Sequence, residues 1–302
     1  MVIISQVILF AAAAPLLSGF IAKVKNNLRM RRGQGIFQPY YNLAKLFSKG
    51  EVVSENASWI FRAAPFVVLS TSLTAAILVP SFIFRSPAGR MGDFLALLFI
   101  LALGRFFLAL AALDTGSSFG GMGSSREMFI SSLAEPAFCM AVFALSLRPG
   151  STDISAFGGA HPVTASAALA GLTLFLVALA ETSRIPVDNQ ETHLELTMIH
   201  EAMVLEYSGR PLALIEMAAY LKQLVFFFLI AQAVFPVSLP AGGAAAVFFW
   251  AVWYVFRIAC VAFAVALVEV AVSKMRLFRA ADFLGFALVL GIIASVCAIL
   301  GA

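Results

Sequence analysis

Long apolar runs recur along almost the whole chain, and they constrain its fold more than any other feature of the sequence. A helix needs about 20 mainly apolar residues to cross roughly 30 Å of hydrocarbon. These runs are continuously apolar and do not alternate with polar residues, so the pattern is not that of a membrane β-barrel. We expect eight transmembrane helices, at residues 2–22, 63–84, 93–113, 128–147, 162–181, 211–236, 243–272 and 281–301.

The composition agrees with this interpretation. The chain of 302 residues is 62% hydrophobic and 12% charged, with a mean hydropathy of +0.97, whereas soluble domains are about 25% charged. No internal repeat or low-complexity linker is visible. We therefore expect an all-α integral membrane protein, with a single polytopic domain over residues 1–302, in contact with the lipid bilayer and not with nucleic acid.

The distribution of lysine and arginine predicts the orientation. If the N-terminus lies outside, the inner loops hold fourteen of the 20 cations, the outer loops three, and the spans three. Loops rich in lysine and arginine face the cytoplasm. We therefore expect a multi-pass protein of the cell inner membrane with both termini on the outer, periplasmic side.

The first inner segment has the pattern of an amphipathic helix. Apolar side chains recur at helical spacing over residues 37–47, and Gln38 and Lys45 belong to the complementary polar stripe. Arg31 and Arg32 come just before it. We expect a cytoplasmic-side interfacial helix, and the pattern leaves open whether it lies on lipid or docks a partner.

Another inner segment, 114–128, is rich in Gly and Ser. It lacks the lysine of a phosphate-binding loop, so we expect a loop that lets helices approach closely. The three cysteines, Cys139, Cys260 and Cys297, lie far apart in apolar runs, and this spacing offers no ligand set for zinc or an iron–sulfur cluster.

The most polar stretch of the chain runs from Glu181 to Tyr207, between two membrane-length apolar runs. It holds six of the sixteen acids and two of the three histidines. No H-E-x-x-H pattern occurs in it, so a metal site is not favoured. A solvated loop and a functional entrance both fit the pattern. We expect the segment to lie on the cytoplasmic side.

Several ionisable residues interrupt or border the apolar runs. Such residues are costly in a membrane and face the bundle interior or water. They serve either as structural ion pairs or as an ion relay, and their number favours a hydrated polar path. No arrangement of a nucleophile with a base is visible, so we expect no catalytic residue, no cofactor-binding residue and no metal ligand. The groups are Arg105, Asp114, Glu135, Glu181, Glu206, Glu216, Lys222, Arg257, Glu269 and Asp282.

Three motifs carry a resemblance to a known family. They are R-R-G-Q-G-I-F-Q-P-Y-Y-N-L-A-K-L-F at 31–47, the stretch G-R-F-F-L-A-L-A-A-L-D-T-G-S-S-F-G-G-M-G-S-S-R-E-M at 104–128, and E-T-S-R-I-P-V-D-N-Q-E-T-H-L-E-L at 181–196. With them, the chain resembles the membrane subunit shared by respiratory complex I (subunit 1 of NADH-quinone oxidoreductase) and the energy-converting nickel–iron hydrogenases. The later stretch 197–210 is most similar to the hydrogenase branch, which includes the formate hydrogenlyase membrane subunit.

The resemblance implies a membrane subunit that anchors soluble subunits and couples their electron transfer to movement of protons or sodium, with protons preferred. The implied partners are the hydrogenase small and large subunits, a ferredoxin-like iron–sulfur subunit and an antiporter-like membrane subunit. Iron–sulfur clusters and the nickel–iron centre would belong to these partners, and this chain would hold no cofactor. The implied ion pathway comprises Asp114, Glu135, Glu181, Glu206, Glu216, Lys222, Arg105, Arg257 and Glu269. The implied docking surface comprises Arg31, Arg32, Gln38, Lys45, Arg184, Asp188, Glu191, His193, Glu195, His200 and Glu201.

Two other functions remain as alternatives. A complex I-like subunit would help to form a quinone site, but the segment 33–39 is shorter than in that branch, which disfavours quinone. A stand-alone ion transporter would commonly show inverted repeats and broken helices, and neither is evident. A further hypothesis is a purely structural anchor, in which every buried charge is locked in an ion pair.

Overall fold

The structure is a computed structural model, and it describes residues 2–54, 56–79, 92–147, 149–154, 164–188, 198–235 and 244–301. Within these residues the chain forms ten α-helices. They are α1 (Val2–Leu28), α2 (Gln38–Ser48), α3 (Trp59–Leu78), α4 (Phe94–Asp114), α5 (Ser118–Ser146), α6 (Ala165–Glu181), α7 (His200–Val204), α8 (Gly209–Val234), α9 (Ala244–Ala271) and α10 (Leu277–Ile299).

Each of the eight predicted spans coincides with a helix. Seven of these helices are long and apolar enough to cross a membrane. The eighth, α6, is shorter in the described part of the chain, with 17 residues. The prediction of an all-α, multi-pass membrane protein is confirmed.

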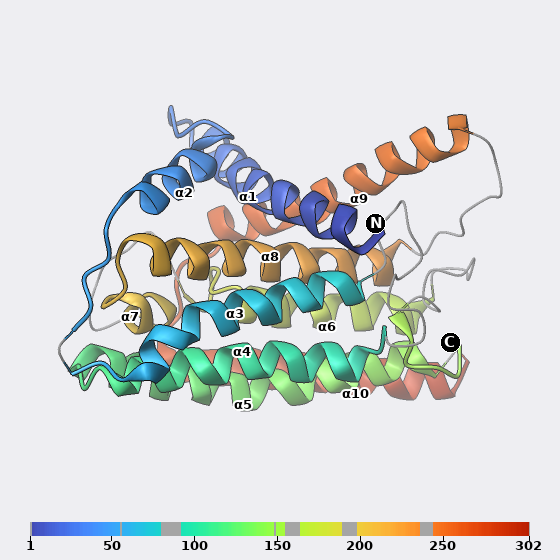
Figure 1. The fold of residues 1–302 in the computed structure, drawn as a ribbon. Helices are drawn as coiled ribbons and strands as arrows, with labels where there is room; N and C mark the ends of the chain where they lie inside the picture. Colours follow the sequence, from blue (N-terminus) through green and yellow to red (C-terminus); the bar gives the residue numbers. More distant parts are fainter. Residues whose placement is uncertain are drawn as a thin grey trace.

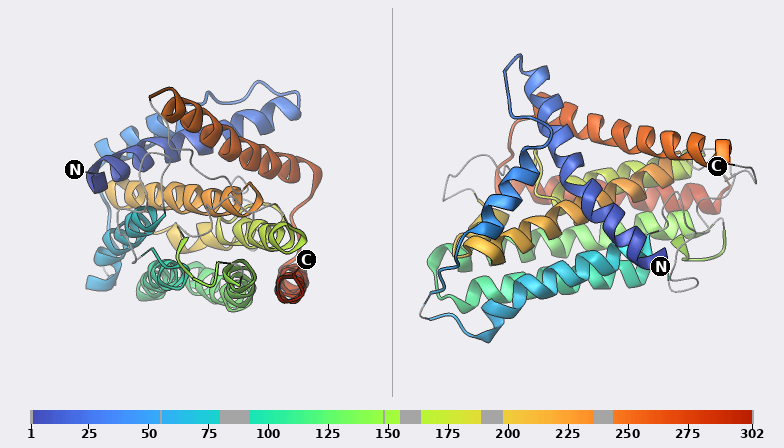
Figure 2. Two further views of the ribbon diagram at one scale, coloured as in Figure 1. Left: turned by 90° about the vertical axis from the view of Figure 1, so that its right-hand side faces the viewer. Right: turned by 45° about the horizontal axis from the view of Figure 1, so that its top comes forward.

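The long helices run side by side as an elongated bundle (Figure 1). Both termini lie toward one end of the bundle, and α7 lies at the other end. Helix α8 is central, with neighbours that include α1, α2, α3 and α6, and the two turned views show it enclosed by the other helices (Figure 2). Its stretch from Gln223 to Ala231 is buried at every position, because a helix that is apolar all round is stable only when it is covered on all sides.

Small side chains help the helices to pack closely in the interior of the bundle, and many large apolar side chains are exposed on its outside. Ala134, Ala137 and Ala141 of α5 are fully buried, whereas Phe99 and Phe286 are more than half exposed. Helices in a membrane gain little from hiding apolar surface from lipid, so they associate through close packing of small residues. The large exposed side chains form the surface expected to contact lipid.

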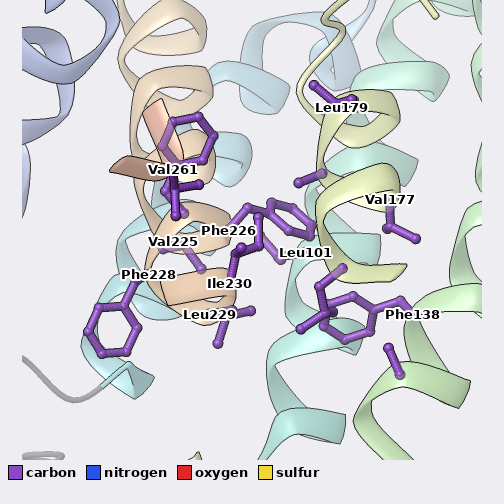
Figure 3. Packing of buried hydrophobic residues seen from close by; sticks show 14 of the residues in the cluster. Leu101, Phe138, Val177, Leu179, Val225, Phe226, Phe228, Leu229, Ile230 and Val261 are labelled. Carbon is purple, nitrogen blue, oxygen red and sulfur yellow. The ribbon is translucent and has the colours of Figure 1, made fainter. Parts of the chain in front are cut away.

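Aromatic side chains fill the space between α8 and its neighbours (Figure 3). Phe226 of α8 meets Phe138 of α5 edge to face, with ring centroids 6.0 Å apart, in an arrangement that aromatic quadrupoles favour. Leu101 of α4 and Val177 of α6 belong to the same core cluster. This packing holds α4, α5, α6 and α8 at fixed distances from one another.

The expectation of a loop over 114–128 is wrong for most of that segment, because α5 already begins at Ser118. The Ser117 hydroxyl accepts from the amide of Gly120 and caps the new helix. Ser124 then donates to the carbonyl of Ala109 on α4. Glycine is costly in a helix by about 1 kcal/mol, and here the close contact between helices outweighs that cost.

The predicted amphipathic helix is present as α2, with Pro39 in its first turn, where a missing amide hydrogen costs little. Pro39 and Leu43 are buried, and Tyr41 is 69% exposed. The Tyr40 hydroxyl donates to the carbonyl of Ala12 on α1, and burial raises the pKa of Tyr40. Helix α2 is therefore tied to the bundle by one face while the other face is free.

In the acidic segment, residues 181–188 and 198–207 are described, and among them α7 covers His200–Val204. The expected docking residues Glu191, His193 and Glu195 lie outside the described residues.

Candidate functional site

A cavity of about 70 Å³ lies among α3, α4, α5, α7 and α8, beside the end of α6. A water needs about 10–15 Å³ of such space and two to four polar partners, so the cavity has room for several waters. Its polar lining comprises Thr71, Ser72, Arg105, Glu127, Glu181, Thr182, Ser183, Arg184, His200, Tyr220, Lys222 and Gln223.

Three predicted ion-pathway residues meet at this cavity. Glu181, the last residue of α6, forms ion pairs with Arg105 of α4 and with Lys222 of α8, and the Lys222 Nζ to Glu181 Oε2 distance is 2.7 Å. Arg105 also donates to Oε1 of Glu135 on α5 at 2.7 Å. Arg105 and Glu181 have side chains less than a tenth exposed. Charges held this deeply are stable only when such partners surround them.

The sequence after α6 explains how Glu181 comes to face the cavity. The helix ends there with a tight turn, in which Ser183 has a positive φ of 52° and the amide of Arg184 donates to the carbonyl of Leu179. A carboxylate at a helix C-terminus is repelled by the helix dipole. Arg105 and Lys222 offset that repulsion.

A second ion cluster lies beside the first. Glu269 of α9 is paired with Arg184 at 3.0 Å and with Lys25 of α1 at 3.2 Å. Arg184 also donates to Oε1 of Gln223 at 3.1 Å, and Arg29 donates to the backbone carbonyl of Glu269. The cluster joins α1, α8 and α9 to the segment that follows α6.

Asp188 organises the start of α7. Its carboxylate accepts from the amides of Ile199 and His200, both at 3.2 Å, and is 2.7 Å from Nζ of Lys274. Asp188 is only 2% exposed. Burial and the nearby Lys222 lower the pKa of His200, against the opposing effect of Glu201 and Asp188.

The positions of the predicted docking residues divide into two groups. Asp188 is buried and Arg184 and His200 are half-buried in the contacts described above, and their assignment to a docking surface remains a prediction. The others among the described residues lie at or near the surface, with exposed or half-buried side chains: Arg31, Arg32, Gln38, Lys45 and Glu201.

Two other predicted ion-pathway residues cap helices. The Asp114 carboxylate accepts from the amides of Ser58 at 2.7 Å and Phe61 at 3.4 Å, at the start of α3. Arg257 donates to the carbonyl of Ala231 at 2.6 Å, near the end of α8. Helix termini leave such groups unpaired, so both side chains have a structural reason to be where they are. Neither lines the cavity.

Glu206 and Glu216 are also outside the cavity lining. The side chain of Glu206 is exposed and that of Glu216 is half-buried. The assignment of Glu206 and Glu216 to an ion pathway remains a prediction, and their positions outside the cavity give it no further support.

The sequence reasoning did not select Glu127, although this residue is 7% exposed and lines the cavity. It fell in the segment predicted to be a loop, one residue before the predicted span. A signal was present: Glu127, Ser131 and Glu135 follow at intervals of four, which places them on one face of a helix.

Among the residues that the structure describes, no group of three or more His, Cys, Asp or Glu is placed to hold a metal ion. The three cysteines are free and partly buried. The charged side chains at the cavity can exchange protons and orient water, and they offer no assembled ligand shell.

The fold and the cavity define a class of protein, namely a polytopic helical membrane protein whose helices line a charged cavity with room for several waters. The family model described as NADH dehydrogenase matches residues 1–300, and the chain belongs to this family, whose members include the complex I subunit 1-like membrane subunits.

The relatives point to one branch. The chain is 37% identical to hydrogenase-4 component C of Escherichia coli (strain K12), over 74% of this chain and 71% of that protein. It is 35% identical to formate hydrogenlyase subunit 4 of the same organism, over 73% and 72%. Subunit 8 of the NADH-quinone oxidoreductase of Rhodothermus marinus is 27% identical, over 67% and 61%.

The fold has a counterpart among solved structures. A chain of the membrane-bound sulfane sulfur reductase, an archaeal respiratory membrane complex, superposes with a TM-score of 0.78 at 16% identity, over 99% of this chain and 100% of the other. At this identity the likeness concerns the fold alone.

Proposed function

We propose that this chain is the membrane-embedded subunit of a multisubunit hydrogenase of the formate hydrogenlyase type. It anchors the soluble iron–sulfur and nickel–iron subunits and couples their electron transfer to proton translocation. The observation that carries the proposal is the buried ion cluster of Arg105, Glu181 and Lys222 at a cavity with room for water. A similarity of more than a third to two hydrogenase membrane subunits supports the choice of complex.

The cluster suits proton movement for a physical reason. Ionisable groups are expensive in a membrane interior and are retained where they line a path for ions or water. Here they come from α4, α5, α6 and α8 and share one cavity. A rigid anchor alone has no need for a polar cavity at their centre.

The proposed partners follow from the same relationship. They are the hydrogenase small and large subunits, a ferredoxin-like iron–sulfur subunit and an antiporter-like membrane subunit, and the partners hold the clusters and the nickel–iron centre. We place the complex in the cell inner membrane with both termini of this chain outside. The end of the bundle that carries α7 then faces the cytoplasm, together with exposed Arg31, Arg32 and Lys45.

Affinity purification tests the assembly. A tagged copy of this chain, extracted in mild detergent, should bring down iron–sulfur and nickel–iron subunits together with hydrogenase activity. Recovery of the chain alone, or with quinone-reducing subunits, would contradict the assignment to a hydrogenase.

Inverted membrane vesicles test the coupling. With reduced ferredoxin as the electron donor, hydrogen evolution by the intact complex should acidify the vesicle interior, and an uncoupler should abolish the acidification but not the hydrogen. Hydrogen evolution with no acidification in the parent complex would refute proton translocation. Proton flux in proteoliposomes that hold this chain alone would favour a stand-alone transporter.

A further inference from the structure

Helix α5 carries a polar stripe that the functional assignment does not yet use. Glu127, Ser131 and Glu135 are spaced by four residues, so they succeed one another along one face of the helix. Glu127 is 7% exposed and Ser131 3%, and the side chain of Glu135 is 40% exposed. The stripe therefore runs from the buried cavity to a side chain at the outer surface of the bundle.

Two cations of the cavity are already paired with other carboxylates. Arg105 is bound to Glu181 and Glu135, and Lys222 is bound to Glu181. None of the ion pairs formed among the described residues includes Glu127. An ionised Glu127 would be a buried charge with no direct ion-pair partner, and protonation removes that charge.

The charged groups that face Glu127 come from several elements. Arg105 of α4, Lys222 of α8 and His200 of α7 line the same cavity, together with Glu181 and Arg184 at and after the end of α6. Asp188 lies nearby, where it accepts from the amide of His200. Glu127 has no direct cation partner among the described residues, whereas Glu181 is held by two.

Ser131 supplies a second, independent observation. Its hydroxyl is buried and has no hydrogen-bond partner among the described residues. Buried hydroxyls nearly always have a partner. A hydroxyl donates one hydrogen bond and accepts others, so one placed a helical turn from each of two carboxyl groups is suited to pass a proton between them.

We propose that Glu127 is the acid that takes up and releases the transferred proton, and that Ser131 passes it along α5 to Glu135. The proposal rests on the proposed function, since it presupposes proton translocation. The Glu127 carboxylate takes a proton from water and becomes a neutral acid. That proton moves to the Ser131 oxygen as the hydroxyl gives up its own toward Glu135. Every group recovers its initial state when Glu135 releases the proton to water in the second cavity, of about 20 Å³, which it lines together with Arg105. Glu181 stays ionised throughout.

The test uses the assembled complex in inverted vesicles and measures protons moved per hydrogen molecule evolved. Glu127→Gln should keep assembly and hydrogen evolution with reduced ferredoxin, but lower proton movement by about a hundredfold or more, the range for loss of a proton-transferring group. Ser131→Ala should lower it severalfold, and Glu127→Asp should restore part of the activity. The matched controls are Ser132→Ala, on the exposed face of the same helix, and the exposed Glu51→Gln, and both should behave like the parent.

Infrared difference spectra of the complex between acid and neutral pH give a readout that a structural role would not affect. A carbonyl stretch of a protonated carboxyl group should be present in the parent and absent from Glu127→Gln. If the parent pumps and Glu127→Gln pumps equally well with an unchanged spectrum, the role of Glu127 is refuted while the proposed function stands. A parent complex that moves no protons refutes the proposed function itself.

Discussion

Glu181 is the residue on which most of the buried charge of the site depends. It binds two cations from two helices, and its side chain is 7% exposed. Removing one partner of a buried pair leaves the other partner charged and without compensation, which costs far more than the pair itself contributes. Because the loss of one partner is so costly, the interaction between Glu181 and its cations can be measured from the stabilities of variants.

We expect Glu181→Gln to lower the free energy of unfolding by about 3–5 kcal/mol, because Lys222 then loses the ion-pair partner shown in the structure. The double variant Glu181→Gln with Lys222→Met should lose much less than the sum of the two single changes. Thermal unfolding in detergent of the four proteins of this cycle provides the measurement. Simple additivity would show that the two side chains do not interact.

His200 should make the protein sensitive to acid. Burial lowers its pKa in the folded state, so the unfolded chain binds a proton more readily, at an ordinary pKa of about 6.5. The stabilising contribution is complete above that pH and is lost as the pH falls below it, by at most about 1.4 kcal/mol per pH unit.

Measurements of unfolding between pH 7 and pH 5 test this expectation. His200→Gln should lose less stability than the parent over that interval, while the two should respond alike between pH 7 and pH 8. A parent and a variant with parallel curves throughout would show that His200 does not titrate differently in the folded state.

At the scale of elements, glycines of α5 decide how closely α7 approaches. A Cβ added at Gly123 would lie 2.9 Å from Cβ of Ala202 and 3.0 Å from the carbonyl oxygen of Ile199. A Cβ at Gly121, on the same helix, would meet nothing within 4 Å. Gly121 and Gly123 are the same residue type on the same helix, but Gly123 faces α7 and Gly121 faces open space.

We therefore expect opposite effects from the same change. Gly121→Ala should be neutral or stabilising by up to about 1 kcal/mol, the difference in helix propensity. Gly123→Ala should be destabilising by about 1–3 kcal/mol, because α7 must move away. Thermal unfolding in detergent compares them, and equal effects would mean that α7 does not pack against α5 as described.

At the scale of the whole molecule, the distribution of cations predicts the orientation in the membrane, and the bundle makes the prediction testable. The two termini lie toward one end (Figure 1). Lys49, after α2, and Leu300, after α10, are both exposed. The prediction is that Lys49 faces the cytoplasm and Leu300 the outside.

Single cysteines at these positions, in a chain whose native cysteines are replaced by serine, report the sides. A membrane-impermeant maleimide should label Leu300→Cys in intact spheroplasts and Lys49→Cys only in inverted vesicles. The reverse pattern would overturn the predicted orientation and place α7 on the outer side.

The sequence predicts the place of some charged residues better than that of others, and the reasons are physical. Arg105, Glu181 and Lys222 were selected because charge inside an apolar run is visible in one dimension, and the structure brings all three to one cavity. Asp114 and Arg257 are likewise charged residues in or at the end of an apolar run, but each caps a helix end and neither lines the cavity. A charge that lines a cavity and a charge that caps a helix look alike in a sequence, because the partner that distinguishes them is distant in the chain.

Apolar runs and the helical spacing of residues 37–47 by themselves determined the class of this protein, its eight apolar helices and its amphipathic α2, because hydrocarbon requires long apolar helices whatever their packing. Only the tertiary structure decided which charges meet. The extension of α5 to Ser118 turned an expected loop into helix and brought Glu127 into the cavity, and the fold of residues 182–188 drew Arg184 and Asp188 inward. Both outcomes depend on contacts between helices far apart in the sequence, where local preference is outweighed by packing.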